Sequence, residues 1–88
     1  MTIYISAKFI SGEVLFSWSY RKLIQTYHVQ ITRGDSVDPW DTVFRTEYKV
    51  KDALLYDSIS ITVKVLGDST ENMCTFKGTG SYNYLHYD

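Results

Sequence analysis

The stretch Ile59-Ser60-Ile61-Thr62-Val63-Lys64-Val65-Leu66 decides the fold of this chain. Four β-branched apolar residues occupy every second position in it, and polar residues lie between them. A strand places alternate residues on one face, whereas a helix would spread them around its circumference. β-branched side chains also favour a pleated sheet over a helix. The stretch therefore predicts a central strand with one buried face.

Shorter alternating runs lie on both sides of this strand. We expect further strands over residues 3–9, 14–19, 27–32, 42–46, 48–50 and 73–77. Turn-forming residues separate these runs, and no segment of useful length has a helical period. About seven short strands without helices predict a single all-β domain, an antiparallel β-sandwich or small barrel. We assign residues 1–78 to the sandwich and residues 79–88 to an aromatic C-terminal tail of the same domain.

Four sets of alternating residues resemble the strands of a fibronectin type III domain, an immunoglobulin-like β-sandwich. In chain order they are Val14-x-Phe16-x-Trp18, Tyr27-x-Val29-x-Ile31, Tyr48-x-Val50 and Ile61-x-Val63-x-Val65. The resemblance extends over roughly residues 3–77 and implies a seven-stranded sandwich. That family is a scaffold for binding loops, so the resemblance carries no activity with it.

Length and charge exclude several classes of partner. The chain has 88 residues, a formal net charge of −1 and no basic cluster, so we expect no nucleic-acid partner. No apolar run approaches the length of a membrane span, and we expect no membrane association. Cys74 is the single cysteine, which suits a reducing compartment. The first residues lack the features of a signal peptide, so we expect synthesis and folding in a cytosol.

The tripeptide Arg33-Gly34-Asp35 matches the adhesive motif that some fibronectin type III domains display to integrins. Here it follows the third predicted strand, whereas the adhesive copy in that family lies near the last strand. Gly supplies a positive φ, and Asp and Ser hydrogen-bond to nearby backbone, so Gly34-Asp35-Ser36 also has the composition of a turn. We interpret the tripeptide as a turn.

Acidic residues recur at a spacing of three in the following loop, at Asp35, Asp38 and Asp41, with Glu47 nearby. Calcium loops need several oxygen ligands that converge around one ion. This spacing matches no calcium loop, and Pro39-Trp40 interrupts it, so we interpret the acids as solvated loop residues and expect no metal.

Catalysis lacks a recognisable set of residues. A thiol nucleophile requires a neighbouring base and a third group that orients the base. His28 and His86 are far apart in the sequence, His28 is expected to point outward, and Cys74 alternates with Phe76 as a small core residue. We therefore predict no enzyme activity, no zinc site and no cofactor.

Aromatic residues outside the predicted core are the best indication of function. Trp40 lies in a polar loop, and Tyr82, Tyr84 and Tyr87 follow the last core strand. Tyr and Trp dominate many protein interfaces because they bury a large area and keep a polar group. The alternative is that the tail extends the last strand and folds onto its own domain. We take these four residues as candidate protein-binding residues, and the tail could also mediate self-association.

The sequence thus favours a non-catalytic protein–protein interaction module. Its architecture is similar to that of small accessory or decoration proteins of bacteriophage particles. We therefore expect a structural or accessory subunit of a larger, virion-like assembly. The alternative is a small inhibitor that binds and blocks a host or competitor protein through its loops.

Overall fold

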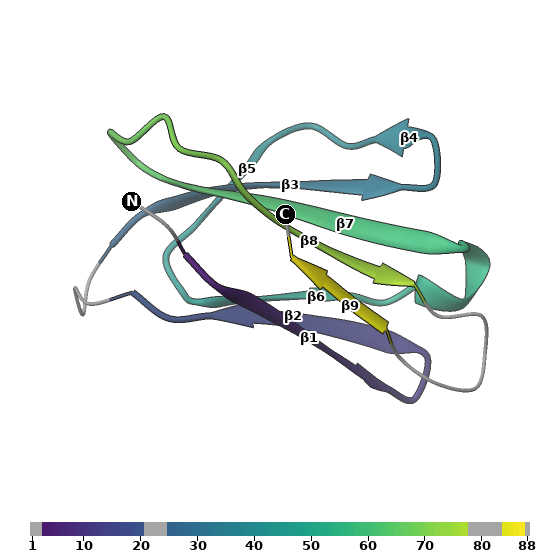
Figure 1. Cartoon of the computed structure of the whole chain (residues 1–88). Coiled ribbons are helices and arrows are strands. Elements are labelled where there is room, and N and C mark those ends of the chain that lie inside the picture. The colour runs from purple at the N-terminus through teal and green to yellow at the C-terminus, as the bar shows by residue number, and fades with distance from the viewer. Residues whose placement is uncertain (1–2, 21–24, 78–83, 88) are drawn as a thin grey trace.

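Two antiparallel sheets face each other across a common core in the computed structural model, which describes residues 3–20, 25–77 and 84–87 (Figure 1). The first sheet has the order β1-β2-β6 and consists of β1 (Ile5–Ile10), β2 (Glu13–Trp18) and β6 (Glu47–Val50). The second has the order β4-β3-β7-β8-β9, and β5 pairs with β3 beside β4. Its strands are β3 (Tyr27–Arg33), β4 (Ser36–Val37), β5 (Asp41–Val43), β7 (Ser58–Val65), β8 (Asn72–Lys77) and β9 (Tyr84–Tyr87). The predicted all-β fold with two packed antiparallel sheets is confirmed.

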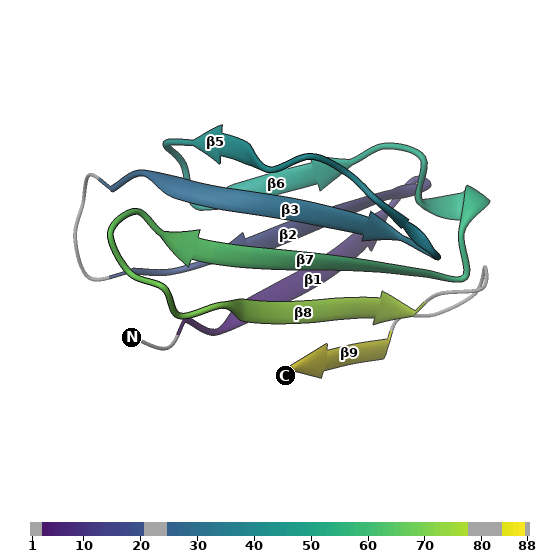
Figure 2. The same ribbon diagram turned by 90° about the horizontal axis from the view of Figure 1, so that it is seen from above.

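Strand β7 is the centre of the second sheet, as the alternation in its sequence predicts. It pairs with β3 on one side and β8 on the other (Figure 2), and its four alternating branched residues are buried. The register places Val29 opposite Val63 and Ile31 opposite Ile61, so the inward residues of β3 and β7 form one continuous apolar surface. Thr62 differs from the expectation, because it lies on the outer face yet is only 7% exposed.

Trp18 lies in the core, as predicted from its alternation with Val14 and Phe16. Its side chain is 6% exposed, and its ring meets Tyr27 edge-on at a centroid distance of 5.5 Å. The indole Nε1 has no hydrogen-bond acceptor in the described part of the chain. Burial raises the pKa of the Tyr27 hydroxyl and Tyr20 raises it further, while the neighbouring Trp18 indole lowers it without the geometry of a hydrogen bond. Trp18 is therefore held by packing.

The described residues contain two strands more than the seven predicted; one is β9, and the β4–β5 region explains the other. β4 and β5 lie one after the other along the same edge of β3, and Pro39 lies between them. Proline has no N–H to donate, so it interrupts a strand and is tolerated at a sheet edge. The predicted strand over 42–46 is shorter in the structure and begins at Asp41, and the separate strand β4 precedes it.

Asn72 ties the beginning of the chain to the second sheet. Its Oδ1 accepts a hydrogen bond from the backbone N–H of Ile3 at 2.8 Å, and its Nδ2 donates to the carbonyl of Val63 at 3.2 Å. Asn72 is buried, and these two bonds satisfy its amide in the interior. The rings of Phe9 and Phe76 stack with their centroids 5.5 Å apart. This contact joins β1 to β8 at the lateral edge where Ile3 meets Asn72.

Candidate functional site

Arg33-Gly34-Asp35 forms the turn between β3 and β4. Arg33 pairs with Ser36 across the hairpin, and the two residues between them form the loop. Gly34 has a φ of 57°, while Asp35 is not among the residues with positive φ, the sign pattern of a type II′ turn. The interpretation of this tripeptide as a turn is supported by this geometry.

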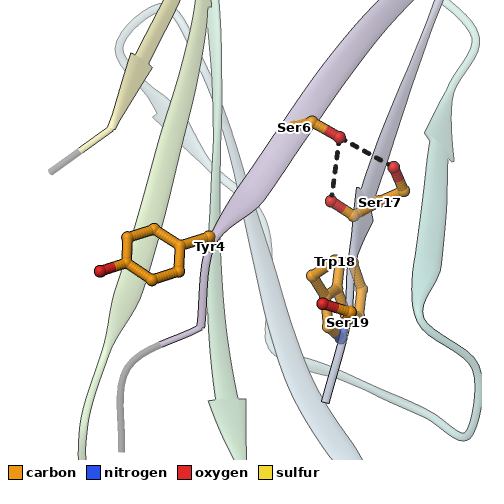
Figure 3. A pocket seen from close by; sticks show the side chains of 5 residues that line it. All are labelled: Tyr4, Ser6, Ser17, Trp18 and Ser19. Carbon is orange, nitrogen blue, oxygen red and sulfur yellow. Dashed lines mark hydrogen bonds between the residues drawn. The ribbon is translucent and has the colours of Figure 1, made fainter.

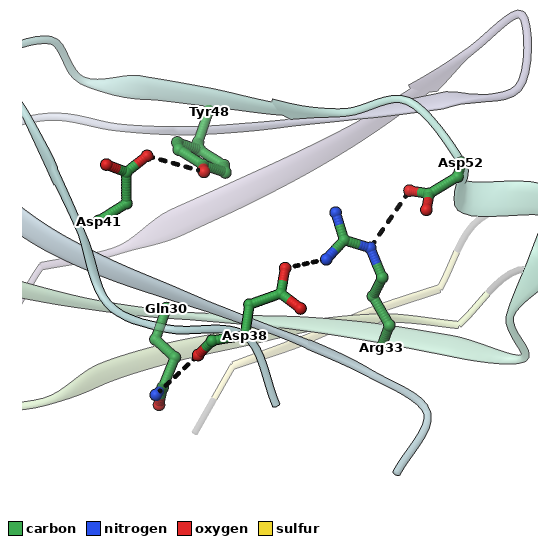
Figure 4. A network of polar contacts seen from close by, with 6 residues as sticks. All are labelled: Gln30, Arg33, Asp38, Asp41, Tyr48 and Asp52. Carbon is green, nitrogen blue, oxygen red and sulfur yellow. Dashed lines mark hydrogen bonds and ion pairs between the residues drawn. The ribbon is translucent and has the colours of Figure 1, made fainter. Parts of the chain in front are cut away.

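The guanidinium of Arg33 is engaged within the domain (Figure 4). It forms ion pairs with Asp38, which precedes β5, and with Asp52, which follows β6, the latter at 3.2 Å. Burial on its own would lower the pKa of Arg33, but the hydrogen bonds to both carboxylates outweigh this and raise its pKa. We call these three residues the Arg33 bridge. It joins the two sheets at one lateral edge, so the charged group of Arg33 is engaged within the domain.

A second polar contact joins the sheets at this edge. The hydroxyl of Tyr48 on β6 donates a hydrogen bond to the Asp41 carboxylate on β5 at 3.0 Å (Figure 4). Burial raises the pKa of Tyr48, and the hydrogen bond to Asp41 raises it further. Asp41 thus accepts a hydrogen bond from the facing sheet, and Asp38 pairs with Arg33 within the second sheet, structural roles that the sequence interpretation of solvated loop acids missed. No three His, Cys, Asp or Glu side chains lie together as metal ligands in the part of the chain that is described.

Trp40 lies on the surface beside β7. Its side chain is 41% exposed, and Nζ of Lys64 lies 4.3 Å from the centre of its ring. A cation over an indole at this distance is an attractive cation–π contact, worth about 0.5–1 kcal/mol at an exposed site. One face of Trp40 is therefore already used within the domain, and the exposed remainder stays a candidate for partner binding.

The three candidate tyrosines are placed unequally. Tyr84 and Tyr87 are the terminal residues of β9, whose backbone pairs with β8 of the same chain, and Tyr82 lies outside the described residues. A strand added by a partner would therefore have to use the outer edge of β9. Whether these tyrosines bind a partner stays a prediction.

Of the two histidines considered with the thiol for catalysis, His28 is not brought near Cys74, and His86 lies on β9 opposite Thr75. Cys74 belongs to β8 and its side chain is fully buried in the core. His28 lies on the outer face of β3, between the buried residues Tyr27 and Val29. These positions agree with the predicted orientation of both side chains.

An open depression of about 280 Å³ lies on the outer face of the first sheet (Figure 3). It is lined by Tyr4, Ser6, Ser17, Trp18 and Ser19. The hydroxyls of Ser6 and Ser17 lie 3.0 Å apart and bond across the strand pair. The depression offers hydroxyl groups and one exposed aromatic ring, and its lining residues carry no charge.

Three large aliphatic side chains at one end of the sandwich are strongly exposed. Ile10, at the end of β1, is 51% exposed, and Leu54 and Leu55, in the 3₁₀ turn η1 (Ala53–Leu55), are 63% and 75% exposed. The β1–β2 turn and η1 lie at the same end (Figures 1 and 2). Leu54 contacts Gly12 of that turn so closely that a Cβ on Gly12 would be 3.3 Å from its Cδ1. We call Ile10, Leu54 and Leu55 the apolar end.

This surface was not identified from the sequence. Two consecutive leucines in so short a connection were the available signal. In the structure the short 3₁₀ turn buries Ala53 and leaves both leucines exposed.

Comparison with known proteins adds no relative. The chain matches no protein-family model, no curated protein and no solved structure. No helix in the described residues is long and apolar enough to cross a membrane.

Proposed function

We propose that this chain is a non-catalytic protein-interaction module that docks through its apolar end. The observation that carries the proposal is the exposure of Leu54 and Leu55, adjacent residues beside the β1–β2 turn. Scattered single apolar residues are normal on a protein surface, but a group of them indicates an interaction site. Burying one such side chain against a partner contributes about 1.5–3 kcal/mol.

The fibronectin type III arrangement is part of this proposal. If β4 and β5 count as one interrupted fourth strand, then the first, second and fifth strands form one sheet, and the third, sixth and seventh lie in the other. Immunoglobulin-class sandwiches divide their strands in this way. Such sandwiches gather their loops at two ends, and the apolar end occupies one of them.

The kind of partner we propose is a larger protein assembly such as a bacteriophage particle, with this chain as a structural or accessory subunit. Three aliphatic side chains are few beside the roughly 20–30 residues per side of a standard interface. The area that each copy buries against the assembly is then small. A small contact suits a subunit that binds to a surface with many identical sites.

The test compares capture of proteins from the native source by three forms of the chain. Leu54→Ser/Leu55→Ser removes the apolar end, and Phe44→Ser/Leu66→Ser removes two exposed apolar residues from the β5–β6 and β7–β8 connections as a matched control. Both pairs are exposed, so each variant should keep its stability within about 1 kcal/mol. We expect one protein, identified by mass spectrometry, to be captured by the parent and the control and lost with the Leu54/Leu55 variant. Equal capture by both variants would refute docking through the apolar end.

A further inference from the structure

Strand β9 is an edge of the second sheet. It runs antiparallel to β8, with Cys74 opposite Tyr87 and Lys77 opposite Tyr84. No strand in the described ranges pairs with its other side, and Figure 2 shows it as the outermost strand next to β8. Its outer backbone N–H and C=O groups can therefore accept another strand.

The other sheet edges in the described part of the chain carry features that discourage strand pairing. β1 contains Lys8, and β6 contains Glu47 and Lys49. The β4–β5 edge is divided into segments of two and three residues by Asp38-Pro39-Trp40. Charges, proline and very short strands are the usual means by which proteins keep their sheet edges from pairing with other chains.

β9 lacks the charges and the proline. Its sequence, Tyr84-Leu85-His86-Tyr87, contains no Lys, Arg, Asp, Glu or Pro, and two of its four residues are tyrosines, which favour strands. The core described between Ile3 and Phe76 already joins both sheets, and the stack of Phe9 on Phe76 closes the gap between β1 and β8. β9 therefore stands out as an edge strand without protective charges or proline, next to a core that is already assembled and with β1 close to it.

We propose that the outer edge of β9 pairs with β9 of a second copy of this chain, antiparallel and around a twofold axis. A second copy fits this edge because the segment is compatible with itself. Pairing centred on Leu85 sets Leu85 opposite Leu85 of the other copy and Tyr84 opposite His86, with no acidic or basic pair of like charge. The net charge of −1 adds little repulsion between copies.

The contact is small, because each copy contributes four strand residues. It should therefore appear as a dimer that forms with increasing protein concentration. Sedimentation velocity of the full chain at concentrations up to about 1 mM measures the dissociation constant directly. A parent chain that stays monomeric over this range would overturn the proposal.

Charge substitutions test whether β9 is the contact. Leu85→Lys/His86→Lys sets like charges directly opposite each other, and Leu85→Glu/His86→Glu does the same with the opposite sign. Each variant should dimerise at least about tenfold more weakly than the parent, because like charges opposite each other destabilise a strand pair. An equimolar mixture of the two variants should recover dimers that neither forms alone. Failure of the mixture to recover them, with both variants still folded by circular dichroism, would refute pairing through β9.

A matched control places the same kind of charge on another edge of the same sheet. Val37→Lys, on the exposed strand β4, should leave the dissociation constant unchanged. This inference is independent of the apolar end, so the Leu54→Ser/Leu55→Ser variant should dimerise like the parent. Loss of dimerisation in either control would contradict the assignment to β9.

Discussion

Replacement of Trp18 by alanine should remove a large part of the stability of this domain. Trp18 is 6% exposed, and burial of about 200 Å² at about 25 cal/mol per Å² sets an upper value of about 5 kcal/mol. Measured Trp→Ala substitutions in cores cost about 3–5 kcal/mol, which we expect here. The edge-on contact with Tyr27 accounts for about 0.5–1.5 kcal/mol of this loss.

Trp18→Phe separates packing from hydrogen bonding at this position. It keeps an aromatic ring against Tyr27 and removes an indole N–H that has no acceptor in the described residues. Burying an unsatisfied donor costs about 1–3 kcal/mol, so its removal offsets part of the lost volume. We expect Trp18→Phe to cost less than half as much as Trp18→Ala.

Urea unfolding followed by far-ultraviolet circular dichroism measures these free energies without depending on tryptophan fluorescence. A domain of this size has about 4–13 kcal/mol of stability, so Trp18→Ala should shift the midpoint strongly or leave the chain unfolded. Trp40→Ala is the surface control and should cost at most about 1 kcal/mol, because its cation–π contact with Lys64 is exposed. The reasoning is refuted if Trp18→Ala unfolds within about 1 kcal/mol of the parent.

Two further predictions concern the β3–β4 turn and alkaline pH. Gly34→Val should lower the free energy of unfolding by about 1–3 kcal/mol in the urea assay because of its φ of 57°, since a Cβ there would meet Tyr56 at an ordinary 3.9 Å. Asp35→Glu should leave the free energy of unfolding unchanged. Equal losses of stability in the two variants would contradict the turn assignment. The pKa values of Tyr27 and Tyr48 are raised in the fold, first by burial, so the folded state holds their protons more tightly than the unfolded state. Their contribution to stability is present below the ordinary tyrosine pKa of about 10 and is lost as pH rises through the folded pKa. Urea midpoints should fall above pH of about 10, less steeply in Tyr48→Phe, and a midpoint that rises there would show the opposite sign.

The core strands could be predicted from the sequence because each has one buried face. The twofold alternation of apolar and polar residues reports which face is buried, and this information is local. It placed Trp18 and the branched residues of β7 in the core, and it placed Cys74 beside Phe76. The β3–β4 turn was equally readable, because Gly34 is required by its positive φ.

The contacts at the lateral edge that holds the Arg33 bridge could not be predicted, because they depend on how strands and loops are placed after the two sheets have packed. Arg33 matches part of an adhesive motif in the sequence, and the packing of the two sheets brings Asp52 to its guanidinium beside Asp38. Asp41 similarly gains its role from Tyr48, which lies on the facing sheet.

The sequence by itself determined which residues of each strand face inward, since alternation within a strand is a local property. The tertiary structure alone decided which residues remain exposed after the sheets have packed. Leu54 and Leu55 could have entered the core by composition, yet the short 3₁₀ turn between β6 and β7 buries Ala53 and leaves both leucines at the end of the sandwich. Exposure depends on how the whole chain covers a surface, and a local pattern does not contain that information.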